Sequence, residues 1–71
     1  MLDETSQRVI EYLRAYIRQF QYSPSQRDIA KACNLNAATV VRHLDLLEAH
    51  GLIRREPGLA RSIVLCNPGK V

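Results

Sequence analysis

The chain has 71 residues, of which 46% are hydrophobic and 24% charged, and this fits one small globular domain rather than two. A domain of this size uses nearly every apolar side chain in a single core. Little interior is left for a catalytic pocket, which excludes most enzyme classes. The net charge of +3 arises after residue 51, where Glu56 is the only acidic residue and the basic residues are Arg54, Arg55, Arg61 and Lys70. A positive field there suits a polyanion, although a solvated basic surface gives the same pattern.

Targeting signals and metal-binding motifs do not stand out in the sequence. No apolar run approaches the roughly 18 residues of a membrane span, and the chain opens on acidic residues where a signal peptide would be basic, so we expect a cytoplasmic protein. Cys33 and Cys66 are then expected to be free thiols, although a disulfide between them stays open. Together with His43 and His50 they lack the spacing of a zinc site, so we expect no metal and no cofactor.

Apolar residues at steps of three and four predict a first helix that begins after Asp3 as its N-cap. We expect Pro24 to stop this helix, because a proline keeps the residue before it out of the helical region. The predicted inward stripe consists of Val9, Ile10, Leu13, Tyr16, Ile17 and Phe20. The tyrosines of this region have a spacing that favours packing at the rim of the core over stacking on nucleic-acid bases.

Two further helices follow, joined by a short turn. Ser25 and Asp28 have the spacing of a capping box, which predicts a helix over 26–33. Asn34 tolerates the left-handed conformation that ends a helix, and Asn36 is a strong N-cap for the next one. That third helix is predicted from Ala37 to about residue 50, where a glycine follows. Its inward stripe is predicted to be Val40, Leu44 and Leu47.

A β-hairpin is predicted at the C-terminal end. Two short apolar runs, 52–56 and 61–66, flank the turn-forming residues 57–60. Alternation predicts that Ile63 and Leu65 face the helices while arginines project from the hairpin. We expect a domain over residues 1–66, and residues 67–71 form a tail or the start of a linker. The predicted fold class is therefore mainly α with a small β-hairpin: a winged helix-turn-helix, with three helices followed by a two-stranded wing.

In this fold the helix after the turn enters the DNA major groove. With its apolar stripe buried, the third helix is expected to present Ala38, Thr39, Val41 and Arg42 to the bases. Arg42 has a donor fork that matches guanine, and Thr39 bonds a phosphate or a base edge. The small and apolar side chains at 38 and 41 suit thymine methyl groups. Two plainer interpretations stay open: Ala38 is simply a good helix former, and Arg42 pairs with Asp45 three residues on.

Other polar residues are expected to hold the DNA backbone. The start of the second helix offers donors to phosphate, and the wing offers positive charge. The predicted backbone-contacting residues are Ser25, Gln26, Arg27, Arg54, Arg55 and Arg61. His43 lies beside the buried stripe, so we interpret it as a half-buried structural residue. We find no combination of Ser, His and Asp that predicts a nucleophilic active site, and no small-molecule site is evident.

The residues now quoted resemble a known family. The segments 28–31, 39–44 and 47–54 are similar to winged-helix bacterial transcription regulators, and nearly the whole chain resembles the DNA-binding domain of the LexA repressors. The resemblance implies a sequence-specific double-stranded DNA-binding domain of a repressor in the SOS response. It acts on the bacterial nucleoid by occupying its operator, with a homodimer on a palindromic operator as one arrangement. It also implies that the operator is contacted by Asn36, Ala38, Thr39, Val41 and Arg42, with Arg61 on the DNA backbone.

The sequence departs from the family in two places. Its turn is one residue shorter, and Val41 and Arg42 stand where acidic residues are usual, so we expect a different operator. Full repressors of this family carry a self-cleaving Ser/Lys peptidase domain that has no counterpart in these 71 residues. We therefore expect no enzyme, and both an excised domain and a small stand-alone relative fit. A different class also stays open: a winged helix whose third helix binds a partner protein.

Overall fold

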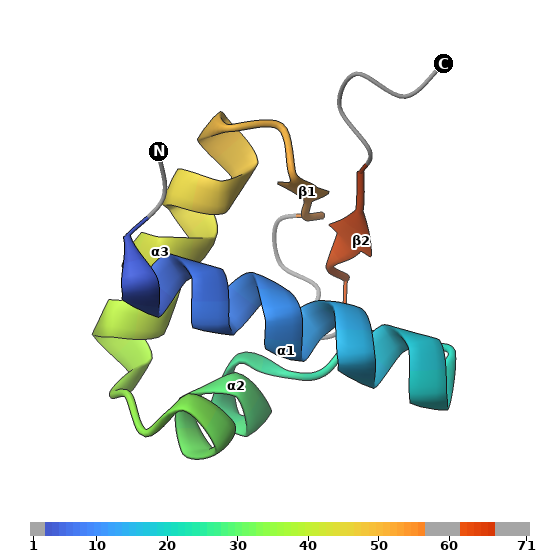
Figure 1. Ribbon diagram of the computed structural model, residues 1–71, viewed down its shortest axis with the longest axis horizontal. Helices are drawn as coiled ribbons and strands as arrows, with labels where there is room; N and C mark the ends of the chain where they lie inside the picture. The colour runs from blue at the N-terminus through green and yellow to red at the C-terminus, as the bar shows by residue number, and fades with distance from the viewer. Residues whose placement is uncertain (1–2, 57–61, 67–71) are drawn as a thin grey trace.

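The computed structural model describes residues 3–56 and 62–66. Three helices precede a two-stranded antiparallel hairpin (Figure 1): α1 (Glu4–Phe20), α2 (Gln26–Cys33), α3 (Ala37–Ala49), β1 (Ile53–Arg54) and β2 (Val64–Leu65). This confirms the predicted fold class. The expected turn at 57–60, Arg61 and the tail at 67–71 lie outside the described residues, so the domain boundary at residue 66 stays a prediction. No helix in the described ranges has the length and apolarity needed to cross a membrane.

Both ends of α1 are fixed by local hydrogen bonds. At the start, Asp3 accepts from the backbone N–H of Ser6 at 2.7 Å, as predicted. At the end, Gln21 adopts a left-handed conformation with φ 66°, and its N–H donates to the carbonyl oxygen of Ile17 at 2.9 Å. The helix therefore ends at Phe20, just before the expected stop at Pro24. The left-handed cap at Gln21 was not predicted, because glutamine is not a typical left-handed residue.

The segment around α2 follows the predicted caps. Asp28 N–H donates to Ser25 Oγ at 3.1 Å and Ser25 N–H donates to Asp28 Oδ2 at 3.2 Å, which completes the capping box. Asn34 ends the helix with φ 58°, and the next N–H, from Leu35, donates to Ala30 at 2.8 Å. These two caps limit α2 to the predicted bounds, and only three residues, 34–36, separate it from α3.

The caps of α3 also follow the prediction. Asn36 Oδ1 accepts from the N–H of Thr39 at 2.8 Å and starts the helix. At the other end, Gly51 takes a positive φ of 76°, which only glycine adopts at no steric cost. The N–H groups of Gly51 and Leu52 donate back to Glu48 and Leu47 at 2.9 and 3.0 Å. These two hydrogen bonds end α3 sharply and turn the chain towards the wing.

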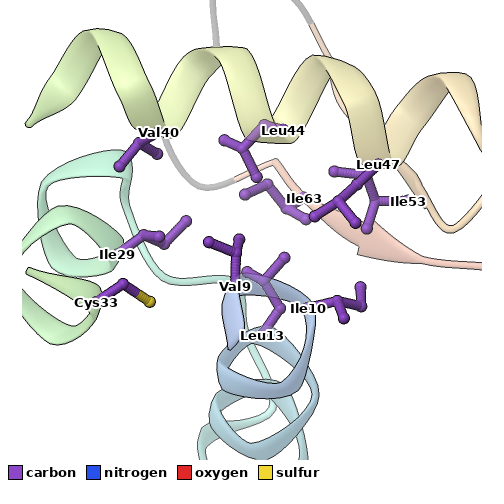
Figure 2. Close-up of a cluster of buried hydrophobic side chains, with 10 residues drawn as sticks. All are labelled: Val9, Ile10, Leu13, Ile29, Cys33, Val40, Leu44, Leu47, Ile53 and Ile63. Carbon is purple, nitrogen blue, oxygen red and sulfur yellow. The ribbon is translucent and has the colours of Figure 1, made fainter. Parts of the chain in front are cut away.

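The core lies where the three helices and the wing meet. Each helix packs against the other two, and β1 packs against α3. Figure 2 shows that every described element except β2 contributes, together with the residue before β2. The buried residues are Val9, Ile10, Leu13, Ile29, Cys33, Val40, Leu44, Leu47, Ile53 and Ile63. The predicted inward stripe of α3 is fully buried, which fixes the direction that its opposite side faces.

The wing is shorter in strand than predicted but has the predicted facing. Ile53 pairs with Leu65, and Arg54 pairs with Val64. Ile63 is buried and Val64 is exposed, so alternation holds. The N–H of Ile63 donates to the buried Ser23 Oγ at 3.3 Å, which attaches the wing to the segment between α1 and α2. The hairpin is therefore held by the body of the domain rather than by its own two-residue strands.

Phe20 differs from its predicted place on the inward stripe. It is 44% exposed and Tyr22 is 51% exposed. The ring of Phe20 lies tilted against that of Tyr16 at a centroid distance of 4.6 Å, and the ring of Tyr22 meets Tyr16 edge-on at 5.7 Å. Tyr16 contacts Tyr12 in turn at 5.8 Å. The stripe of α1 fails at its last turn because this end of the helix extends past α2 and α3 (Figure 1). Tyr12 packs against the core at its rim, as predicted, whereas Tyr22 is exposed.

Candidate nucleic-acid interface

The outer side of α3 presents the predicted base-contacting residues together. Ala38, Val41 and Arg42 are exposed and Thr39 is partly exposed, while Val40 on the other side is fully buried. Helical geometry places these four side chains on neighbouring turns of one surface. The result is an exposed surface of small and apolar side chains with a single guanidinium.

Asn36 lies at the start of this surface, and its side-chain oxygen is used to cap α3. Its Oδ1 accepts from Thr39 N–H and caps α3. The NH2 group of the same amide is a donor, so Asn36 is suited to acceptors such as phosphate oxygens or base nitrogens. Thr39 is held close to it by the same cap. The two residues therefore combine a structural role with the predicted contact role.

The start of α2 provides a second set of polar groups. Gln26 and Arg27 are exposed, as expected of backbone-contacting residues. Ser25 is only partly exposed, and its hydroxyl is engaged in the capping box with Asp28. The positive end of the α2 dipole lies at the same place and favours a negatively charged group there. Ser25 therefore fixes the start of α2 through its cap. The side chains of Gln26 and Arg27 face solvent, where they are open to contact.

The two arginines of the wing take different directions. Arg54 is exposed, whereas Arg55 turns towards α3 and its side chain is only 20% exposed. The alternation of the hairpin left open whether Arg54 or Arg55 projects, and in the structure it is Arg54. Its Nε donates to Glu48 Oε1 at 3.0 Å, and its Nη2 group pairs with Asp45 and with the same Glu48 oxygen. Asp45 thus has Arg55 as its partner, and not Arg42 as the alternative interpretation held.

The pairing of Arg55 also affects its ionisation. Partial burial of the guanidinium acts to lower its pKa, but the hydrogen bonds to Asp45 and Glu48 outweigh this and hold the pKa above its ordinary value. Arg55 stays charged, and two carboxylates of α3 are neutralised in part. The signal available in the sequence was the i, i+3 spacing of the two acids Asp45 and Glu48 on the third helix.

His43 is buried more deeply than expected and contacts α1. Its Nδ1 shares a hydrogen bond of 2.7 Å with the buried Ser6 Oγ and lies 4.0 Å from Asp3 Oδ1. The structure thus brings a serine, a histidine and an aspartate together, which the sequence analysis did not foresee. Both oxygens approach the same ring nitrogen, whereas a catalytic triad uses both nitrogens. The cluster joins the start of α1 to α3. The pKa of Asp3 is lowered, first by the hydrogen bond from the Ser6 backbone N–H and then by the one from the Ser6 hydroxyl.

A surface hollow of about 500 Å³ lies next to this junction. Its lining comes from the start of α1 and the outer side of α3: Asp3, Thr5, Arg42, His43, Asp45 and Leu46. The hollow is lined by residues of both charges. It shows that Arg42 stands at the edge of α3 that adjoins the N-terminus of α1.

The cysteines occupy different environments. Cys33 is buried in the core, and burial raises the pKa of its thiol. Cys66 is partly exposed, and both are free thiols in the structure. Among the described residues, no three His, Cys, Asp or Glu side chains are grouped to hold a metal ion.

Known proteins resemble this chain over most of its length. The model of the LexA DNA binding domain matches residues 1–62. The LexA repressors of Thermosipho melanesiensis, Brevibacillus brevis and Geobacter metallireducens are 44%, 43% and 40% identical over 64, 65 and 62 residues. These alignments cover 90%, 90% and 86% of this chain but 32%, 31% and 31% of those relatives. The chain therefore spans about a third of the length of the proteins it matches. Because the family match covers residues 1–62 and so contains all three helices and β1, the chain belongs to the LexA DNA-binding domain family.

Proposed function

We propose that the chain is the sequence-specific double-stranded DNA-binding domain of a bacterial transcription repressor that acts by occupying its operator. The observation that carries the proposal is the outer surface of α3. Val40 and Leu44 are fully buried, so the opposite side of the helix, with Ala38, Val41 and Arg42, faces solvent. A rigid helix with small side chains and one guanidinium matches the width and the donor and acceptor pattern of the major groove.

The proposed contacts divide into two kinds. Arg42 and Thr39 bond base edges, Ala38 and Val41 contact thymine methyl groups, and Asn36 donates at the start of α3. Contacts to the DNA backbone position the domain without choosing a sequence. The proposed backbone-contacting side chains in the described residues are Gln26, Arg27 and Arg54, which are all exposed.

Two copies of the chain are proposed to bind one palindromic operator. A single winged helix covers one half-site, and two half-sites about 10 to 10.5 base pairs apart place two domains on the same side of the duplex. The name repressor belongs to relatives of which this chain covers about a third, and it supports the proposal of repression. With this function the chain works in the cytoplasm, on the nucleoid.

The test is selection from a pool of randomised duplexes by the purified chain at roughly 0.15 M salt, where nonspecific electrostatic binding is weakened. We expect enrichment of one motif, and a paired motif with the spacing of a helical turn if two copies bind side by side. A pool that stays random after repeated rounds would contradict the proposal and favour a protein partner for α3.

A matched pair of variants connects the selected motif to the surface described. Arg27→Ala should weaken binding to every duplex and lower the slope of log K against log salt by about 0.9, because one phosphate contact is lost. Arg14→Ala removes the same charge from an exposed position on α1 and should leave the slope unchanged. Equal effects of the two variants would mean that only net charge matters.

A further inference from the structure

The neighbouring arginines Arg54 and Arg55 have opposite surroundings, although the sequence makes them look equivalent. β1 buries Ile53 and exposes Arg54, and the alternation of a strand returns the next side chain to the side of α3. There Arg55 meets two carboxylates, with its Nε 3.0 Å from Glu48 Oε1 and its Nη2 paired with Asp45. A guanidinium with two of its donor groups engaged in this way is held in one geometry.

The C-terminal part of α3 carries negative charge that no basic residue in its last turn balances. Its last turn contains no basic residue and does contain Glu48, which lies at the negative end of the helix dipole, where a carboxylate is unfavourable. Asp45 lies one turn earlier, so two negative charges stand on the helix that must approach the phosphates. Arg55 provides the missing positive charge from the wing.

This inference rests on the proposed function. We propose that Arg55 is a positioning residue: it docks the wing on α3 and neutralises Asp45 and Glu48, while Arg54 is the wing side chain that contacts phosphate. The division of roles follows from exposure and pairing. Arg54 faces solvent on the outer side of β1, and the side chain of Arg55 is 20% exposed and already bonded. Without Arg55 the two carboxylates of α3 would repel the DNA backbone, and the wing would lose its orientation.

The test is a cycle of variants measured first without DNA. Arg55→Gln should raise the equilibrium constant of unfolding about fivefold, because a partly buried ion pair with two carboxylates is lost. In the Asp45→Asn, Glu48→Gln background, Arg55→Gln should change the equilibrium constant of unfolding less than twofold, because neutral amides form no ion pair with the guanidinium. Urea unfolding at neutral pH measures both. Equal losses of stability in the two backgrounds would overturn the docking role of Arg55. This result does not depend on whether the chain binds DNA.

The same variants are then titrated with the duplex enriched by selection, at salt concentrations from roughly 0.05 to 0.3 M. Arg55→Gln should weaken binding about tenfold in the natural background and less than twofold in the Asp45→Asn, Glu48→Gln background, because its role acts through those carboxylates. A tenfold loss in both backgrounds would make Arg55 a direct phosphate contact and overturn the proposal.

Arg54→Gln is the matched control on the same strand. It should lower the salt slope by about 0.9 in both backgrounds, because it removes a phosphate contact that does not depend on α3. In the background without the carboxylates, Arg55→Gln should leave that slope unchanged. If Arg54→Gln left the slope unchanged while Arg55→Gln lowered it, the two roles would be reversed and the proposal refuted. If the natural chain bound no duplex, the proposed function would fail while the unfolding cycle still decided whether Arg55 docks the wing.

Discussion

Arg42 is the one charged side chain among the proposed base contacts, and it lies exposed on α3 beside Val41. Arg42→Ala should remove discrimination at a single base pair, because a bidentate contact to guanine is worth about 1–3 kcal/mol against the wrong base. Repeating the duplex selection with this variant gives the measurement. The remaining positions of the motif should be unchanged.

The control for this prediction is a backbone-contacting arginine. Arg27→Ala should weaken binding to all duplexes alike and leave the motif as it was. The proposed role of Arg42 would be wrong if its removal lowered affinity uniformly, as loss of a phosphate contact does.

Asp3 gives a prediction for pH. Its lowered pKa, caused first by the N–H of Ser6 and then by the Ser6 hydroxyl, means that the folded state prefers the carboxylate. The contribution of Asp3 to stability is therefore present above its ordinary pKa of 3.8 and is lost as pH falls through the lowered value. The stabilities of the natural chain and of Asp3→Asn in urea unfolding should differ most above pH about 5, and the difference should shrink as the pH falls below 3.8. A difference that did not change with pH would contradict this origin.

Residue-scale contacts were predictable only where they are local. The cap of Asp3 on Ser6 and the capping box of Ser25 follow from spacing within a few residues. The bond between Ser6 and His43 joins positions 37 apart in sequence, and Arg55 reaches Asp45 across 10 residues and a change of element. Both contacts need the packed positions of two elements, which no local pattern contains.

The end of α1 gives a prediction at the scale of elements. Gln21 is held in a left-handed conformation with φ 66°, a region that costs a residue with a Cβ about 1 kcal/mol. Gln21→Gly should therefore increase the free energy of unfolding by about 1 kcal/mol, even though the side-chain bond from Gln21 to the Arg18 carbonyl is lost. Urea denaturation measures it. A loss of stability would show that this side-chain bond outweighs the backbone preference.

The helices were predicted better than the strands for physical reasons. Asn34 and Asn36 are typical cap residues, so the ends of α2 and the start of α3 were readable. Gln21 is not one, so the residue that caps the end of α1 could not be predicted. The two-residue strands were predicted as longer runs because alternation continues past the hydrogen-bonded pairs, and the bond of Ile63 to Ser23, which sets the position of the wing, is tertiary.

At the scale of the whole molecule, one core supports every part of the proposed interface. Leu44 is fully buried where α3 meets the other elements, and Leu44→Ala should reduce the free energy of unfolding by about 2–5 kcal/mol. That is a large share of the stability of a small domain. Leu46→Ala, on the same helix at 37% exposure, should change it by about 0.5 kcal/mol or less. Similar effects of the two changes in urea unfolding would contradict the packing of α3.

The proposed function requires that the outer side of α3 binds duplex DNA. The most direct measurement is the change in backbone amide NMR signals of the labelled chain when the selected duplex, and then a scrambled one, is added. We expect the signals of residues 36–42, Arg27 and Arg54 to shift with the selected duplex, and those of residues 36–42 to shift far less with the scrambled one. Shifts concentrated at Phe20 and Tyr22, or equal shifts with both duplexes, would contradict it.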